Sequence, residues 1–217
     1  MEKLETKKTN QKKIKKKISK NPRVLIILGL FLLIIGIGIY CYNSFEYSKP
    51  LIEDKALIDD FFNEGKTINK HIPTSVKQST SNKYIAVLEI PSISFKTGLV
   101  DFKSSENNVD KHVQIITGSK MPNIKNGNLI LAAHSGTSNI SYFKNLYKMQ
   151  EGDEIYIYYS GIKYGYVLNN IYDVNKTGEV EIKRDPNQNA LTLITCTRNS
   201  ETKQTVYIAY LKNTEQY

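Results

Sequence analysis

The sequence predicts an all-β domain, a sandwich or a barrel, that follows one membrane-spanning helix. Two observations predict the β domain: many short segments rich in Val, Ile, Tyr and Thr follow residue 83, and Gly, Asn, Asp and Ser separate them. Little helix is expected among these segments, as is typical of a sandwich or barrel. A third observation, a long apolar run without charge near the N-terminus, predicts the membrane helix.

Residues 1–23 are a basic tail that we expect to lie in the cytoplasm. They hold nine Lys and one Arg against two Glu, a net charge of +8 out of the total of +9, so the remaining chain carries only about +1. A nucleic-acid-binding domain keeps its positive charge on the folded part, so nucleic acid is not an expected partner. We favour the interpretation that the tail only sets membrane topology. The alternative is that it also binds anionic lipid head groups.

Residues 24–42, VLIILGLFLLIIGIGIYCY, are the predicted transmembrane helix. Nineteen uncharged residues in a helix span about 28 Å, close to the hydrocarbon thickness of a bilayer. A cleaved signal peptide has a shorter apolar core, and a buried core helix is rarely apolar on every face. We therefore expect a single-pass anchor in the cell membrane, with the N-terminus in the cytoplasm and the following residues outside the cell.

Residues 43–82 are expected to form an extracellular helix and linker. The chain leaves the membrane in a connection that ends at Pro50. Residues 51–68 place apolar side chains such as Phe62 among acidic ones, at a spacing that fits an amphipathic helix. Residues 69–82 are rich in Ser, Thr, Asn, Lys and Gln, which indicates a linker.

Residues 83–217 are expected to form the β domain. One helical turn is predicted near residues 141–149. The predicted strands are residues 84–90, 94–100, 113–117, 128–134, 154–159, 162–174, 179–182, 190–196 and 205–211.

The exported part of the chain contains a single cysteine, Cys196, because Cys41 lies at the end of the apolar run. Extracellular domains usually pair their cysteines. An unpaired one indicates intermolecular pairing or a reactive thiol, whereas an inert buried cysteine is also common. The cysteine count alone leaves these interpretations open.

A reactive thiol needs a helper, most often a histidine, because few thiols are ionised at neutral pH. His71 falls in the predicted linker and His112 in a charged loop, so both are expected to be solvated. His134 ends an apolar strand just as Cys196 does. A lone histidine at a strand end is more often structural, but two equivalent strand ends can meet across a sheet. We therefore predict that His134 and Cys196 act together.

Residues 192–196, TLITC, resemble the TLxTC signature of the sortases, the membrane-anchored cysteine transpeptidases of Gram-positive surfaces. The segment LEIPSI (88–93) is similar to the opening of their domain, and LAAHSG (131–136) resembles the strand that delivers their catalytic histidine. FKNL followed by EGDEI (143–155) is similar to their next helical turn and strand. The resemblance covers about residues 83–212, and it implies a single sortase-type eight-stranded β-barrel with short helices.

The resemblance also implies a mechanism and partners. Cys196 would attack the Thr carbonyl of an LPxTG-like sorting signal in a secreted protein and form a thioacyl-enzyme. A cell-wall amine would then resolve this intermediate, with His134 as general base or acid. Thr195 would line the substrate groove. The resemblance implies no required cofactor.

The sequence departs from the family at the arginine that stabilises the oxyanion. That arginine usually starts the strand after the cysteine, where this chain has Gln204. The nearest arginine is Arg198, two residues after the cysteine. Either Arg198 folds back over the site, which we favour because a guanidinium offers charge as well as donors, or Gln204 donates a neutral hydrogen bond. A solvated loop cation is the remaining interpretation of Arg198.

Class and metal content follow from smaller features. No hydrophobic segment follows residue 212, and the stretch before TLITC is short, so we expect an A- or D-like class in housekeeping anchoring rather than pilus assembly. No zinc site is expected, because the exported part has one cysteine and scattered histidines. Some sortases bind calcium, but a solvated surface is the preferred interpretation of the candidate ligands Glu106, Asp110, Asp173, Glu179 and Glu181.

Two rival functions remain open at this point. A cysteine hydrolase of surface peptides shares the first half-reaction with a transpeptidase and releases its product to water. A non-catalytic, membrane-tethered binding module would merely pack Cys196 in its core.

Overall fold

The structure is a computed structural model that describes residues 22–67, 84–138 and 140–217. It divides into two compact units, Met1–Glu46 and Tyr47–Tyr217. Most of the basic tail, the predicted linker and His71 lie outside the described residues.

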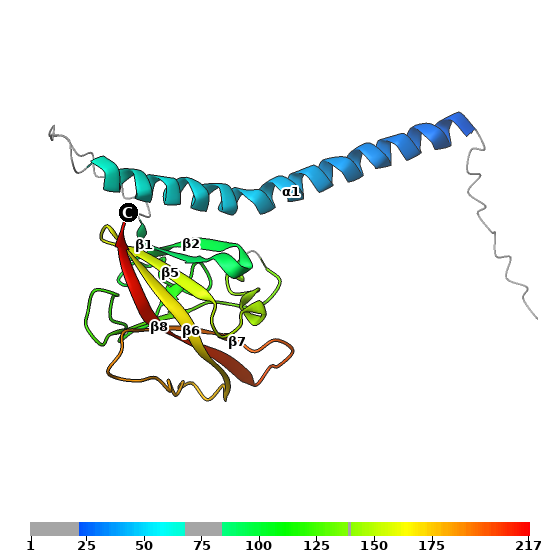
Figure 1. Cartoon of the computed structure of the whole chain (residues 1–217). Coiled ribbons are helices and arrows are strands. Elements are labelled where there is room, and N and C mark those ends of the chain that lie inside the picture. The colour runs from blue at the N-terminus through cyan, green and yellow to red at the C-terminus, as the bar shows by residue number, and fades with distance from the viewer. Residues whose placement is uncertain (1–21, 68–83, 139) are drawn as a thin grey trace, which may run out of the picture. The chain divides into compact units, whose positions relative to one another are not determined.

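Helix α1 runs without interruption over Pro22–Thr67 (Figure 1). Its segment Arg23–Tyr42 has a mean hydropathy of 2.9 and no buried residue, so its length and composition suit a membrane span. The sequence predicted two elements separated at Pro50, and this separation is wrong. Proline removes one backbone donor and disfavours a helix interior, but α1 continues through Pro50.

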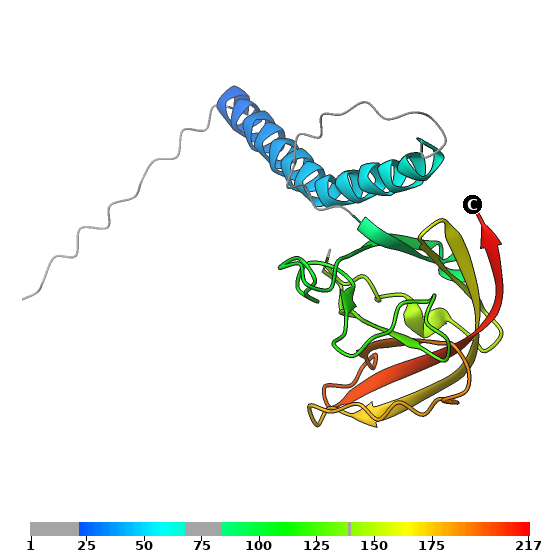
Figure 2. The same ribbon diagram turned by 90° about the vertical axis from the view of Figure 1, so that its left-hand side faces the viewer.

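Eight strands form one sheet in the order β2-β1-β5-β6-β8-β7-β4-β3. The sheet curls round so that its edge strands β2 and β3 contact each other, which makes a nearly closed barrel (Figures 1 and 2). All neighbours are antiparallel except β4 and β7. The strands are β1 (Tyr84–Ile90), β2 (Phe95–Val100), β3 (Gln114–Ile115), β4 (Asn128–Ala132), β5 (Glu154–Tyr159), β6 (Ile162–Asn175), β7 (Ala190–Cys196) and β8 (Lys203–Gln216).

The predicted all-β barrel with short helices is therefore confirmed. Two 3₁₀ turns, Pro91–Ile93 and Leu146–Lys148, are its short helices, and the second falls inside the predicted turn. The predicted strand at residues 179–182 is wrong. Its alternating pattern suits a strand, but the Tyr172 hydroxyl donates to the Glu181 carbonyl and accepts from the Lys183 N–H, so a side chain replaces the ladder there.

Alternate residues of the strands fill the barrel interior. On β4 and β7 these are Leu129, Leu131, Leu191 and Leu193, all essentially inaccessible to solvent. Strand β7 is buried on both faces until its last residue, Cys196, which is half-buried. The apolar core thus holds the strand firmly and leaves only its end at the surface.

The described end of helix α1 packs on the outside of β1 and β2. Ile58 joins Tyr84, Val87 and Val100 in a second buried cluster. The Asp54 carboxylate accepts hydrogen bonds from the Tyr84 hydroxyl (2.7 Å) and the Thr97 hydroxyl (3.3 Å). The amphipathic pattern predicted from residue 51 onward therefore serves to cover one side of the barrel.

Candidate active site

The parallel pair β4 and β7 positions the predicted histidine and cysteine. Asn128 lies beside Ala190 and Ala132 beside Ile194, so partners on the two strands differ by 62 positions in the sequence. His134 and Cys196 are separated by the same offset and come two residues after the last paired residues, Ala132 and Ile194. Side chains at matching positions of parallel strands point to the same face of a sheet.

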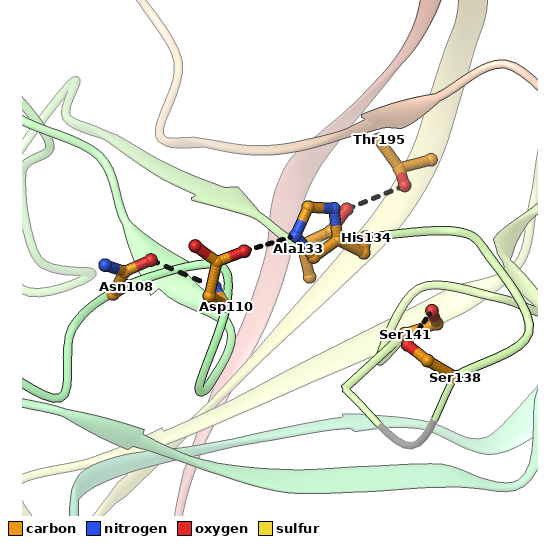
Figure 3. A network of polar contacts seen from close by, with 7 residues as sticks. All are labelled: Asn108, Asp110, Ala133, His134, Ser138, Ser141 and Thr195. Carbon is orange, nitrogen blue, oxygen red and sulfur yellow. Dashed lines mark hydrogen bonds and ion pairs between the residues drawn. The ribbon is translucent and has the colours of Figure 1, made fainter.

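Two side-chain hydrogen bonds hold the strand ends in this register beyond the ladder. The Thr195 hydroxyl donates to the Ala133 carbonyl at 2.7 Å (Figure 3). The Ser135 hydroxyl donates to the Cys196 carbonyl at 2.8 Å. The residues on either side of the histidine are therefore tied to the cysteine and to the residue before it.

His134 is held at both its backbone and its ring. Its carbonyl accepts the N–H of Phe143 at 2.9 Å, and Phe143 is buried. Its ring Nε2 lies 2.9 Å from Oδ1 of Asp110 (Figure 3). The side chains of His134 and Asp110 are 40% and 70% exposed, so this pair sits at the rim of the barrel.

A cavity of about 330 Å³ opens at this end of the barrel. Three of the predicted site residues, Thr195, Cys196 and Arg198, line it together, while the described lining includes neither His134 nor Gln204. The full lining is Ser135, Gly136, Thr137, Phe143, Lys144, Asn145, Tyr147, Thr195, Cys196, Arg198, Thr205 and Tyr207.

The guanidinium of Arg198 lies over the ring of Tyr147, with its Cζ 4.1 Å from the ring centroid. A cation in this position is attracted by the negative face of the ring. Gln204 instead pairs with Cys196 across the β7–β8 ladder. The arginine of the loop, rather than the residue at the start of β8, thus shares the cavity with the sulfur.

A hydroxyl network lies behind the cysteine. The Thr205 and Thr197 hydroxyls both donate to Oδ1 of Asp173, at 2.8 and 3.2 Å, and lie 2.9 Å from each other. These three residues come from β8, from the position after β7 and from β6. The network joins the strand ends that surround Cys196. Its acceptor, Asp173, is one of the candidate calcium ligands.

The other candidate calcium ligands also face protein partners or line an open surface. Glu106 pairs with Lys111 at 2.7 Å, and this hydrogen bond holds the pKa of Glu106 below its usual range. Glu181 pairs with Lys183 at 3.8 Å. No group of three His, Cys, Asp or Glu residues within the described part of the chain is arranged to hold a metal ion. That the protein needs no metal stays a prediction.

His112 was expected to be solvated, and this expectation is wrong. The ring is half-buried between Tyr84 and Tyr142, each 6.2 Å away between ring centroids. Its Nδ1 is buried and has no hydrogen-bond partner among the described residues, and burial lowers the pKa of the imidazole. The charged residues around His112 gave no sign of this burial, although the next residue, Val113, lies in the core.

Comparison with known proteins identifies the family of the chain. The sequence model of one family, described as the Sortase domain, matches residues 88–213. The chain belongs to the sortase family. Sortase A of Bacillus anthracis is 22% identical over 187 residues, which cover 80% of this chain and 87% of that protein.

Solved sortases share the fold. A Clostridium perfringens Sortase D5 transpeptidase is 23% identical with a TM-score of 0.54, covering 74% of this sortase and 96% of that chain. Sortase C1 of Streptococcus suis is 26% identical with a TM-score of 0.54, and the match covers 61% of this sortase and 74% of that chain. The matched proteins bear different class letters, and the A- or D-like class stays a prediction.

Three residues of the site were missed by sequence reasoning. Asp110 was considered only as a calcium ligand, yet it contacts the histidine. Ser135 directly follows His134, so its position could have suggested a role at the strand end. Tyr147 was seen only as part of a helical turn, and nothing in its local pattern indicates a contact with Arg198.

Proposed function

We propose that this sortase is a cysteine transpeptidase that cleaves an LPxTG-like sorting signal and transfers the secreted protein to a cell-wall amine. The observation that supports the proposal is the parallel pairing of β4 with β7, which runs to Ala132 and Ile194, two residues before His134 and Cys196. Cys196 lines the cavity at this end of the barrel. A thiol and an imidazole side by side are the parts that nucleophilic catalysis at a peptide carbonyl requires.

In the first half-reaction, Cys196 gives its proton to His134 and its sulfur attacks the scissile Thr carbonyl. The tetrahedral intermediate collapses as the C–N bond breaks, and the imidazolium protonates the departing amine nitrogen. The product is a thioester on Cys196. Thr195 contributes by fixing the strand end through its bond to Ala133 and by lining the cavity that receives the peptide.

Arg198 takes the oxyanion role in this proposal. It lines the cavity with the nucleophile, and Tyr147 holds its guanidinium by a cation–π contact. A positive group fixed near the developing oxyanion lowers the energy of the transition state. Gln204 is the alternative donor, because it lies directly across the β7–β8 ladder from Cys196.

In the second half-reaction, an amine of a cell-wall peptide attacks the thioester and His134 accepts its proton. As the new peptide bond forms and the C–S bond breaks, the His134 imidazolium returns its proton to the Cys196 sulfur, so the enzyme returns to its starting state. The proposal needs no cofactor, because the thiol and the imidazole carry both proton transfers.

We also propose that the Arg23–Tyr42 segment anchors the enzyme in the cell membrane. Ten cations precede the apolar run, which favours a cytoplasmic N-terminus and a catalytic β domain outside the cell. Secreted proteins that carry sorting signals would then meet the enzyme on the side where the cell wall is built. Protease added to intact spheroplasts should digest the β domain, whereas a tag on the N-terminus should survive until the cells are lysed.

The test uses the full chain in detergent or nanodiscs with LPxTG-type peptides, with and without an amine such as triglycine. We expect intact mass spectrometry to find an acyl adduct on Cys196 that passes to the amine. The Cys196→Ala variant should give no adduct. The matched Cys41→Ser variant removes the other cysteine and should react as the wild type does.

The other outcomes identify the rival functions. Release of peptide only to water, even with excess amine, would identify a hydrolase. Neither adduct nor turnover with a panel of sorting peptides would leave a binding module. An adduct that survives in Cys196→Ala would overturn the assignment of the nucleophile.

A further inference from the structure

We propose that Asp110 is a positioning residue that selects Nδ1 of His134 as the nitrogen that exchanges a proton with Cys196. This inference deepens the proposed function and rests on it. Its starting point is the 2.9 Å contact between Oδ1 of Asp110 and Nε2 of His134. This sortase would then work with a third group, a carboxylate, behind its histidine.

The contact fixes which ring nitrogen is free. An ionised carboxylate only accepts hydrogen bonds, so Nε2 of His134 must carry a proton and donate it to Asp110. In the neutral ring the other nitrogen, Nδ1, is then an acceptor. Nδ1 lies on the side of the ring away from Asp110 (Figure 3). The tautomer that Asp110 enforces is therefore the one that can take a proton at Nδ1.

The loop that carries Asp110 is ordered by its own hydrogen bonds. The backbone N–H of Asp110 donates to Oδ1 of Asn108 at 2.9 Å (Figure 3). The N–H groups of Lys111 and His112 donate to the Asn108 carbonyl at 2.9 and 2.8 Å. Two residues after Asp110, the half-buried ring of His112 lies against two tyrosines. Asp110 thus stands between a compact turn and a side chain anchored in the barrel.

The neighbouring lysine does not take the carboxylate away from the histidine. Lys111 directs its Nζ to Oε1 of Glu106 at 2.7 Å. This pairing leaves Oδ1 of Asp110 to the imidazole. The loop therefore contains two carboxylates with separate partners, and Glu106 provides a matched control for Asp110.

The contact with Asp110 persists during the proton transfer. When the S–H bond of Cys196 breaks and an N–H bond forms at Nδ1, the ring becomes an imidazolium and the sulfur a thiolate. Nε2–H donates to the Asp110 carboxylate before and after this step, so the contact holds the ring in one orientation. The orientation is kept when Nδ1–H later protonates the departing amine nitrogen.

The test measures thiolate reactivity without any peptide substrate. Full-length protein is treated with iodoacetamide at pH 7, and peptide mass spectrometry follows alkylation of Cys196, with Cys41 in helix α1 as the internal reference. Because both partners are well exposed, we expect Asp110→Asn to slow Cys196 alkylation only about threefold to fivefold. Glu106→Gln should leave the rate within about twofold, and Asp110→Glu should restore part of it.

Peptide kinetics supply the second readout. With LPxTG-type peptides, Asp110→Asn should lower the first-order rate of acylation by a similar factor and leave KM nearly unchanged. A structural role would instead lower the unfolding midpoint and raise KM.

The two proposals fail separately. If the peptides are turned over and Asp110→Asn alkylates and acylates at the wild-type rate, Asp110 has no positioning role although the transpeptidase stands. If no peptide reacts but Asp110→Asn still slows alkylation, the positioning role stands and the substrate assignment fails. If Glu106→Gln slows alkylation as much as Asp110→Asn does, the effect comes from the net charge of the loop and the inference is overturned.

Discussion

The hydrogen bond between Thr195 and Ala133 gives the sharpest test of how the site is assembled. The Thr195→Val substitution keeps the shape of the side chain and removes its hydroxyl. Thr195 is only 6% exposed, and its Oγ1 donates to the Ala133 carbonyl at 2.7 Å. Valine leaves this carbonyl without its side-chain donor in a buried place, and no cavity arises because the volumes match.

The substitution should lower the free energy of unfolding by about 1–3 kcal/mol, because a buried acceptor loses its donor. For a chain of this size, about 2 kcal/mol lowers the unfolding midpoint by roughly 4–8 °C. We also expect acylation to slow, because the bond sets the distance between the ends of β4 and β7 where His134 and Cys196 stand.

The assay is thermal unfolding of the full chain in detergent by circular dichroism, together with the acylation rate at a temperature where both proteins are folded. The control is Thr214→Val, which makes the same chemical change at an exposed position of β8. If Thr195→Val matches Thr214→Val within about 0.5 kcal/mol and acylates at the wild-type rate, the hydrogen bond does not hold the site.

Four further predictions concern other parts of the molecule. Arg198→Ala should lower kcat by about 10²-fold, as removal of one oxyanion donor does, whereas Gln204→Ala should change it less than tenfold; the reverse order in steady-state assays would move the role to Gln204. Gly98→Ala should destabilise the protein by about 1–3 kcal/mol in thermal unfolding, because the added Cβ would lie 1.9 Å from a ring carbon of Tyr84; an unchanged midpoint would contradict this packing. Burial, with a smaller effect of Asp173, raises the pKa of Tyr207 to about 12, so the folded state keeps a proton that the unfolded state releases above pH ~10. The free energy of unfolding should therefore fall as the pH rises from about 10 to about 12, and denaturant titrations should find a shallower fall in Tyr207→Phe. EDTA should leave the acylation rate unchanged, and a loss that calcium restores would show that the metal is needed.

The sequence was sufficient for the parts of the fold that have local signals. The apolar run 190–196 and its cysteine could be predicted because β-branched residues buried on both faces give a continuous pattern. The same holds for β4, and His134 and Cys196 could be paired because both follow such runs. The register of β4 against β7, which is recorded up to Ala132 and Ile194, depends on strand pairing and was visible only in the structure.

The rest of the site depends on contacts between loops, which have no periodicity. Asp110 reaches His134 from a turn 24 positions earlier, and Arg198 reaches Tyr147 from the loop after β7. Local patterns also misled in three places. His112 sits among charged residues yet lies half-buried, and Pro50 was predicted to end a connection between two helices although α1 continues through it. The alternating pattern of residues 179–182 predicted a strand that does not form. For His112, packing beyond the local sequence decided the outcome.

The placement of His134 beside Cys196 is tested most directly by an engineered disulfide. Matching positions on neighbouring strands lie about 4.8 Å apart, within the range of about 4.4–6.8 Å between the Cα atoms of disulfide-bonded cysteines. In a Cys41→Ser background, His134→Cys should form an intramolecular bond with Cys196 under mild oxidation, seen as the loss of both free thiols in intact mass spectrometry. Ala133→Cys, whose side chain faces the barrel interior, should stay reduced. A His134→Cys protein that keeps both thiols, or an Ala133→Cys protein that oxidises as readily, would contradict the arrangement on which the proposed chemistry depends.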